Sequence, residues 1–272
     1  GHGYSTLSNL LILFIMFTHK PLEKALESWC LHRSRTAAFD DILKMTLASL
    51  APRILQEGRS VSIYEDQYME VVNRYPAEHV RKYAPAVLGE LTNAFRLGVT
   101  ASGGWCDPLG RWMEENVGSS RDKQAMGQFF TPESLCDLMA QMTVDSRGPV
   151  ELSVYDSSCG TARNLIAFDR ACHPASFNWY VGVDIDWTVV ATSAINFYFH
   201  GMRGVLIHGN SLSLEEYAGF RVFSPATAWG IQQLSAEECK RYLYTEKNNP
   251  TSTIDGYIPT EKLVLGDQLS LF

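Results

Sequence analysis

Gly127-Gln128-Phe129-Phe130-Thr131-Pro132 and, further along the chain, Asp156-Ser157-Ser158-Cys159-Gly160-Thr161-Ala162 are the two segments that decide the fold. The second segment follows an expected buried strand over residues 152–155 and precedes a helix that starts near Thr161. A turn of small residues at that point leaves backbone N–H groups at a helix N-terminus, where they can receive the polar part of a nucleotide-like ligand. The pattern predicts a ligand site at the first turn of an α/β unit.

Strand-like and helix-like segments alternate from Glu133 onward. Such alternation implies a parallel sheet with right-handed crossovers. After Phe223 only 49 residues remain, so about three further strands would use most of them. The expected strands cover residues 152–155, 179–183, 205–208 and 219–223, and the expected helices cover residues 133–142, 161–172 and 188–199.

The preceding part of the chain, residues 19–118, is expected to be helical throughout. Leu22, Leu26 and Trp29 recur at helical spacing. Further helices are expected over residues 39–55, 64–75 and 76–95, with a short one from Asp107. The apolar run Leu10–Phe17 is eight residues long, whereas a membrane span needs about 20.

The two opening segments resemble the cofactor site of the N6-adenine DNA methyltransferases, in particular the modification subunits of type I restriction systems. The resemblance runs from about Asp107 to Val222. It departs from the usual Asp-Pro-x-Cys-Gly-Ser/Thr-Gly loop at Ser157, Ala162 and Arg163. It implies an α/β, Rossmann-like methyltransferase sheet that could be shortened, preceded by a helical domain, with S-adenosylmethionine (SAM) as the cofactor.

The sequence and the resemblance together predict four regions. Residues 1–18 are expected to be a cloning remnant or an apolar leader, and residues 19–126 a helical N-terminal domain. Residues 127–247 would form the SAM-binding, methyltransferase-like domain, and residues 248–272 a linker and C-terminal tail.

The resemblance assigns the methionine end of SAM to Phe129, Phe130 and Thr131. The alternative is a loop with two core phenylalanines and a helix cap at Thr131. Asp156 ends the first strand, where its carboxylate can accept hydrogen bonds from the loop or from the cofactor's ammonium group. A plain turn or cap acid is the alternative for Asp156.

The remaining cofactor contacts are expected at strand ends. Ser158 and Gly160 belong to the loop, and glycine lets the backbone approach a ligand. Asp184 would bind the ribose hydroxyls, as acids at the second strand of nucleotide-binding folds do. Ile185 would lie against the adenine ring, and Asn210 near the adenine amino group, with a plain turn as the alternative there. Asp186 is expected to cap the next helix.

One family motif is missing from the chain. The family carries Asn-Pro-Pro-Phe/Tyr after its fourth strand, where it holds the target adenine. Neither Asn-Pro-Pro nor Asp-Pro-Pro occurs here. Ser224, Pro225 and Trp229 stand at the corresponding place and could supply an acceptor, a carbonyl and a stacking ring in degenerate form. SAM binding is therefore better supported by the sequence than methyl transfer.

The last residues form a second motif. Gln268-Leu269-Ser270-Leu271-Phe272 resembles the pentapeptide that binds the bacterial sliding clamp, with Gln268, Leu269, Leu271 and Phe272 as the contacting residues. The alternative is an apolar tail that folds onto the domain.

Charge and cysteine usage limit the functional classes. Residues 1–130 hold 14 basic and 14 acidic residues, and residues 131–272 hold 9 and 16, so the net charge of −7 lies in the second part. No basic run is present, which argues against strong DNA binding by the chain alone. The six cysteines lack the paired spacing of a zinc site or a disulfide framework, and a reducing cytoplasm is expected.

Two functions remain open on the sequence. The first is a DNA adenine-N6 methyltransferase, or the SAM-binding subunit of one, that acts on DNA with a separate specificity subunit. The second is a catalytically inactive SAM-binding or DNA-mimicking regulator that contacts restriction or replication machinery through the tail. No metal and no membrane role are expected for either.

Overall fold

The computed structural model describes residues 20–101, 104–117, 130–144, 148–149, 151–174, 176–223 and 230–244. Contacts divide the chain into two compact units, one of residues 1–42 and 70–130 and the other of residues 43–69 and 131–272. Among the described residues, the first unit is helical and the second contains both β-sheets.

Helices build the first unit around a polar contact and aromatic rings. Asp41 is buried; it accepts a hydrogen bond from the Tyr75 hydroxyl at 2.8 Å and pairs with Arg74 at 2.7 Å. The Trp29 and Tyr75 rings lie 4.4 Å apart between centroids. The helices of this part of the chain are a helix over residues 20–29, η1 (Cys30–His32), α2 (Arg35–Ser49), α3 (Glu65–Val72), α4 (Ala77–Ala101) and α5 (Pro108–Asn116), of which α2 and α3 cross the boundary between the units.

A β-hairpin interrupts the stretch that the sequence predicts to be wholly helical. β1 (Arg53–Gln56) pairs antiparallel with β2 (Arg59–Ser62), and the helix expected over residues 39–55 ends earlier, at Ser49. Glu57 and Gly58 form the turn with φ values of 51° and 77°, as the two-residue turns of hairpins require. The all-helical prediction is wrong here, because Glu-Gly is a weaker hairpin signal than Asn-Gly or Asp-Gly.

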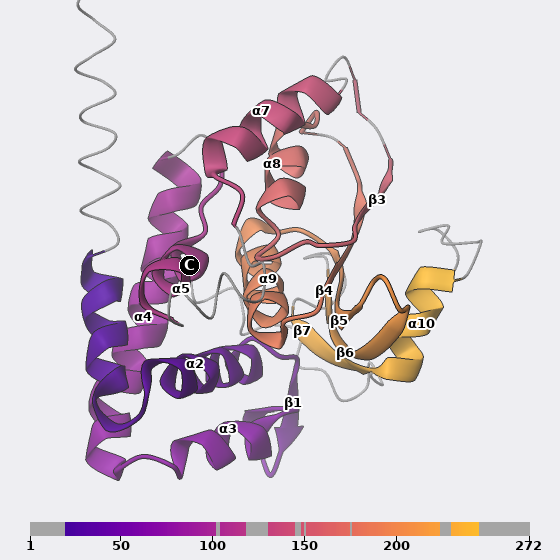
Figure 1. Cartoon of the computed structure of the whole chain (residues 1–272). Coiled ribbons are helices and arrows are strands. Elements are labelled where there is room, and N and C mark those ends of the chain that lie inside the picture. Colours follow the sequence, from indigo (N-terminus) through magenta and orange to yellow (C-terminus); the bar gives the residue numbers. More distant parts are fainter. Residues whose placement is uncertain are drawn as a thin grey trace, which may run out of the picture. The chain divides into compact units, whose positions relative to one another are not determined.

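The second unit is built on a five-stranded sheet of order β3-β4-β5-β6-β7 (Figure 1). The α/β class predicted from the sequence is confirmed. The first three strands are parallel, and the last two are antiparallel to their neighbours. The strands are β3 (Ser153–Asp156), β4 (Trp179–Asp184), β5 (Gly204–Asn210), β6 (Glu215–Val222) and β7 (Ile231–Ser235).

The expectation of a wholly parallel sheet is wrong for β6. Only residues 211–214 join β5 to β6, whereas a parallel crossover needs a dozen or more residues. The chain therefore turns back on itself, and Asn210 pairs with Glu215. The strand expected to be buried over residues 152–155 instead forms one end of the strand order, and its Tyr155 is 55% exposed.

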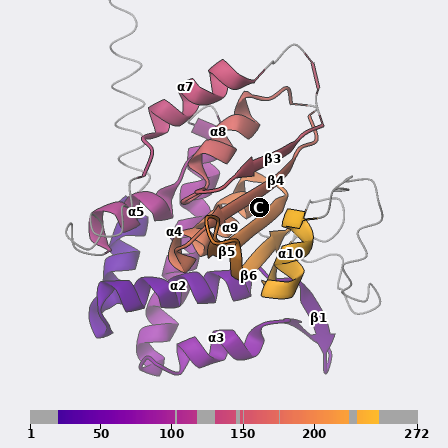
Figure 2. The same ribbon diagram turned by 45° about the vertical axis from the view of Figure 1, so that its right-hand side comes forward.

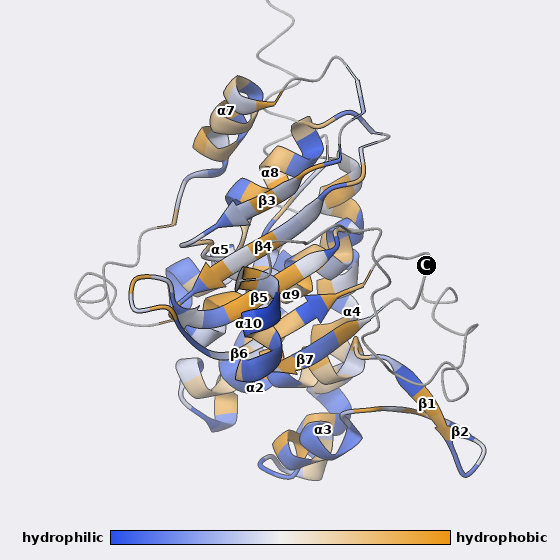
Figure 3. Cartoon of the chain, turned by 90° about the vertical axis from the view of Figure 1, so that its right-hand side faces the viewer, coloured by the Kyte–Doolittle hydropathy of each residue, from blue (hydrophilic) through white to orange (hydrophobic). Residues whose placement is uncertain are grey.

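Helices cover both faces of this sheet. α9 (Trp187–His200) lies behind the strands and α10 (Ala236–Tyr244) in front of them when the sheet is seen as in Figure 3, where β4 and β5 carry the most apolar stretches. α9 is buried along almost its whole length, whereas Cys239 of α10 belongs to one buried cluster with Val181 and Ile207. α7 (Glu133–Thr143) packs against α8 (Arg163–Ala171), beside β3 (Figure 2).

No helix in the described part of the chain combines the length and the apolar character needed to cross a membrane.

Candidate functional site

The turn after β3 is tied to the end of β4. The Gly160 amide donates a hydrogen bond to Oδ2 of Asp184 at 2.9 Å, and the Cys159 amide donates to the Val183 carbonyl at 2.9 Å. The other carboxylate oxygen of Asp184 accepts from the Asp186 amide at 3.1 Å. The structure therefore brings two of the predicted cofactor residues, Gly160 and Asp184, into direct contact at the carboxyl ends of parallel strands.

The conformation of the turn explains its small residues. Oδ1 of Asp156 accepts from the Ser158 amide at 3.0 Å, which closes the first part of the turn. Gly160 and Ala162 then take φ values of 54° and 70°, in the left-handed region that favours glycine. A Cβ atom added to Gly160 would meet no atom within 4 Å. The backbone thus presents an open approach at Gly160.

Helix α9 is hydrogen-bonded to the end of the turn. Nδ2 of the buried Asn196 donates to the Thr161 carbonyl at 2.8 Å. Asp186 caps the same helix, since its Oδ1 accepts from the Thr188 amide at 2.7 Å. The cap role that the sequence predicts for Asp186 is confirmed.

Burial changes the acidity of two groups at the turn. Burial raises the pKa of the Asp184 carboxyl above its usual range, and hydrogen bonds from the Asp186 and Gly160 amides oppose this rise. Burial, and then the nearby Asp184 and Asp156 carboxylates, raise the pKa of the Cys159 thiol well above its usual value. Cys159 is therefore a buried, protonated packing residue.

The side chain of Arg163, at the end of the turn, contacts the backbone of Thr131. Its Nη1 lies 3.4 Å from the Thr131 carbonyl oxygen, and the side chain is only 6% exposed. Thr131 does not cap the following helix, because α7 has Pro132 at its cap position and no side-chain hydrogen bond there. Sequence reasoning noted Arg163 only as a departure from the family loop. Its position next to a predicted ligand turn was the signal that could have identified it.

A cavity of about 370 Å³ adjoins this region between α7, β3 and α8. Asp156 and Ser157 line one side of it, and Cys136 and Ala140 of α7 line another. Phe130, half-buried, lies directly before α7. Asp156 of the turn and residues of helix α7 therefore line the same cavity.

At the end of β5, the side chain of Asn210 is hydrogen-bonded to the turn that follows. Oδ1 of Asn210 accepts from the Leu212 amide at 3.0 Å and from the Ser213 amide at 3.2 Å. An amide oxygen has two lone pairs, so this oxygen is already used by the backbone and the NH₂ group remains to donate. Ile185 is 62% exposed directly after Asp184, which leaves its side chain open to a ligand.

Several predicted residues lie outside the described residues and stay predictions. They comprise one residue of the first segment, the three residues in place of the catalytic motif, and the tail residues: Phe129, Ser224, Pro225, Trp229, Gln268, Leu269, Leu271 and Phe272. Within the described ranges, no group of three or more His, Cys, Asp or Glu side chains could hold a metal ion.

Comparison with known proteins gives one family match. Residues 112–225 match the model of the family described as N-6 DNA Methylase, and this range contains both opening segments. No curated protein matches the chain.

Solved structures that are similar to the chain include the following two. A class I SAM-dependent methyltransferase of Listeria monocytogenes, whose assignment is itself provisional, is 15% identical with a TM-score of 0.39, over 73% of this chain and 54% of that chain. The methyltransferase subunit of a type I restriction-modification system from Streptococcus thermophilus is 14% identical with a TM-score of 0.36, over 69% of this chain and 56% of that chain. The present chain thus spans little more than half of the length of either structure.

Proposed function

Because residues 112–225 match the N-6 DNA methylase family, we propose that the chain is a SAM-dependent DNA adenine-N6 methyltransferase, or the SAM-binding subunit of one. The observation that carries this proposal is the contact between the Gly160 amide and Asp184, 2.9 Å long. It joins the turn after the first parallel strand to the acid after the second, which is the arrangement that nucleotide-binding sheets use for a ribose and its neighbours.

The residues present fit SAM. Asp184 has accepted two backbone hydrogen bonds, and a carboxylate offers about four acceptor sites, so it can still receive ribose hydroxyls. Asp156 supplies a second carboxylate for the cofactor's ammonium group, and the open space at Gly160 admits the ligand to the backbone. Ile185 would pack on the adenine ring, and the Asn210 NH₂ group would donate to a ring nitrogen.

Transfer to DNA requires residues that replace the absent Asn-Pro-Pro motif. When bound, SAM supplies an electrophilic methyl group. In our proposal Ser224 and the Pro225 carbonyl orient the acceptor amino group, and Trp229 stacks on the base. The excess of acidic residues in 131–272 disfavours tight DNA binding by this part alone, so target recognition is assigned to a separate specificity subunit.

Methyl incorporation into DNA from labelled SAM tests the proposal. The parent chain, alone or with a specificity subunit, should label adenine, and the triple change Ser224→Ala, Pro225→Ala and Trp229→Ala should remove the label. Undiminished labelling by the triple variant would show that the catalytic loop lies elsewhere. SAM binding should persist in that variant, which serves as its folding control.

A second candidate function rests on the missing Asn-Pro-Pro motif. A regulator that binds SAM without transferring methyl groups would need no such motif. It would use its acidic second part and the Gln268–Phe272 tail to contact restriction or replication proteins. This candidate predicts SAM binding without labelled DNA, together with co-elution of a sliding clamp that disappears when Gln268–Phe272 is deleted.

A further inference from the structure

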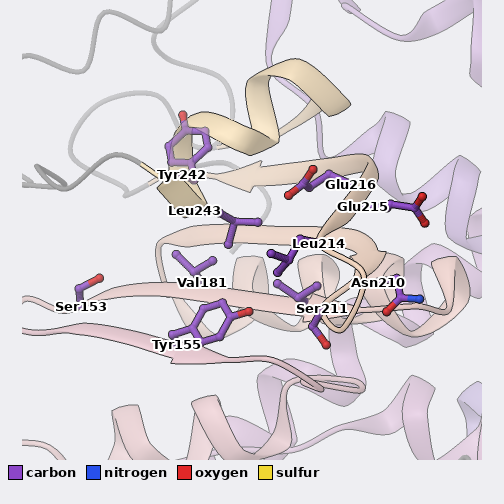
Figure 4. A pocket seen from close by; sticks show the side chains of 11 residues that line it. Ser153, Tyr155, Val181, Asn210, Ser211, Leu214, Glu215, Glu216, Tyr242 and Leu243 are labelled. Carbon is purple, nitrogen blue, oxygen red and sulfur yellow. The ribbon is translucent and has the colours of Figure 1, made fainter.

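A second cavity lies on the face of the sheet that α10 covers. Its volume is about 320 Å³. Val181 and Val183 of β4 line it, and Leu243 of α10 points towards Val181 from the opposite side (Figure 4). Tyr155 of β3 closes the cavity on the side where the strand order ends. The cavity is therefore a largely apolar groove between β3 and α10.

The sheet face at this groove is incompletely covered. α10 packs over β5, β6 and β7. On β3, Ser153 is exposed and Tyr155 is 55% exposed, although both side chains line the groove. Parallel strands are ordinarily covered on both faces by packed helices or other segments. The groove is thus the place on this face where a further segment would bury apolar surface.

The lining of the groove selects the charge of such a segment. Glu215 and Glu216 lie at one end of the groove, and Glu216 is only 9% exposed and points towards α10 (Figure 4). None of the described residues that line the groove is Lys, Arg or His. A complementary occupant is therefore a short apolar run with a cation beside it.

The described part of the chain ends next to the groove. α10 ends at Tyr244, and Tyr242 and Leu243 of its last turn line the groove. A further 28 residues follow Tyr244, and Lys262 lies 18 residues beyond it. Because 18 residues span up to about 60 Å when extended, a segment at Lys262 can reach every part of the groove.

One stretch of these residues has both of the required features. Leu263-Val264-Leu265 is the longest apolar run after Tyr244, and Gly266 follows it directly. Lys262 directly precedes the run and is the only basic residue after Lys247. The last five residues of the chain also contain apolar side chains, but they follow an aspartate and include no base. The run that begins at Leu263 therefore matches the groove better than the last five residues do.

We propose that Leu263-Val264-Leu265 docks in the groove of its own chain. The two leucine side chains pack on the apolar part beside Tyr155, and the Lys262 ammonium group lies at the Glu215–Glu216 end. The contact is intramolecular, so its effective concentration is on the order of mM and even a weak interaction is populated. The docked segment completes the cover of β3. It uses neither the proposed cofactor residues nor the last five residues, and it does not rest on the proposed function.

Disulfide trapping in the full chain tests the docking. Val264→Cys places a thiol between the two leucines, and Ser153→Cys places its partner on the exposed side of the groove. With oxidised glutathione as the oxidant, we expect this pair to form an intramolecular disulfide at least about tenfold faster than the control pair Val264→Cys with Tyr217→Cys. Tyr217 is the matched control because it is 47% exposed on β6 and does not line the groove.

The natural cysteines leave this measurement clear. Five of the six are buried, and Cys30 is half-buried. Burial raises the pKa of the Cys30 thiol to about 11, so little of its reactive thiolate is present near neutral pH. Peptide mapping of the oxidised protein identifies which pair has formed.

Variants of the docked segment identify the interactions that hold it. The double change Leu263→Asp and Leu265→Asp should slow trapping of the Ser153→Cys pair to about the control rate, because it removes the apolar contact. Lys262→Glu should slow the same trapping at least about threefold, since it places a third acid at the acidic end. Lys262→Arg keeps the charge and should leave the rate unchanged.

Equal trapping rates for the Ser153→Cys and Tyr217→Cys pairs would overturn the proposal. A rate that neither the leucine changes nor Lys262→Glu affects would overturn it equally. Disulfide-linked dimers that form faster at higher protein concentration would also overturn it, because a second copy of the chain would then fill the groove. The readout requires neither SAM nor DNA, so its failure is distinguishable from a failure of the proposed function.

Discussion

The Gly160 amide nitrogen lies 2.9 Å from Oδ2 of Asp184, across two parallel strands. A half-buried carboxylate thereby fixes the turn, and in the proposed function the same carboxylate receives the ribose of the cofactor. In the proposed site, cofactor binding and local folding are therefore coupled at this pair.

Gly160→Ala should weaken SAM binding without a steric clash in the free protein. The left-handed backbone at φ 54° costs a side-chain-bearing residue about 1–2 kcal/mol, so the free energy of unfolding should fall by that amount. No atom lies within 4 Å of the added Cβ, which would instead occupy the ligand's approach. We expect SAM affinity, measured by calorimetry, to fall at least about tenfold.

Gly58→Ala is the matched control for that substitution. Gly58 has a φ of 77°, and its added Cβ would also meet no atom within 4 Å, but it lies in the β1–β2 turn. Its variant should lose about as much unfolding free energy and keep the SAM affinity of the parent chain. An equal loss of SAM affinity in both variants would attribute the Gly160 effect to stability alone.

SAM affinity should fall on acidification at a higher pH than an ordinary aspartate would cause. Burial raises the pKa of Asp184, so this carboxyl is protonated on acidification before a typical one with a pKa of about 3.9, and the protonated form is a poorer acceptor for ribose hydroxyls. Calorimetric titrations of SAM at successively lower pH should show this loss of affinity before the pH reaches the pKa of an ordinary aspartate. An unchanged affinity down to the ordinary aspartate range would contradict it.

Folding stability should respond to Asp184 with the opposite sign. Its folded pKa is raised, so between the ordinary and the raised value the folded state binds more protons than the unfolded one. The contribution of Asp184 to stability is therefore largest at low pH and declines as pH rises through that window. Comparing denaturant unfolding of the parent chain with Asp184→Asn across the same pH range isolates this contribution.

Arg163→Gln should loosen the backbone at Thr131. The guanidinium lies 3.4 Å from the Thr131 carbonyl oxygen in a buried position, so removing it leaves that carbonyl without its charged donor. We expect a loss of about 1–3 kcal/mol in unfolding free energy and a lower SAM affinity. Arg163→Lys should restore part of both. Full SAM affinity in Arg163→Gln would mean that Thr131 is held independently of Arg163.

Local patterns predicted the elements around the site well. The helix expected over residues 133–142 is found as Glu133–Thr143, and the strand expected over residues 179–183 as Trp179–Asp184. These segments have clear periodicity and are bounded by turn residues. The Asp186 cap was equally predictable, because an Asp before an apolar helix has one common use.

Features that depend on contacts between distant residues were missed. The direction of β6 depends on its pairing with β5 after a four-residue connection, which an apolar run cannot reveal. The β1–β2 hairpin belongs to the unit of the large sheet, where the Ile231 amide donates to the Leu50 carbonyl at 3.0 Å. Arg163 has a role only because folding brings Thr131 near it.

The most direct test of the account is calorimetric titration of SAM into the parent chain, Asp184→Asn and Asp186→Asn. Asn caps helices as well as Asp does, so Asp186→Asn removes a neighbouring charge without disturbing α9. The account predicts binding by the parent chain and by Asp186→Asn, and an affinity at least about tenfold lower for Asp184→Asn. Equal affinities for all three proteins, or no binding by the parent chain, would contradict it.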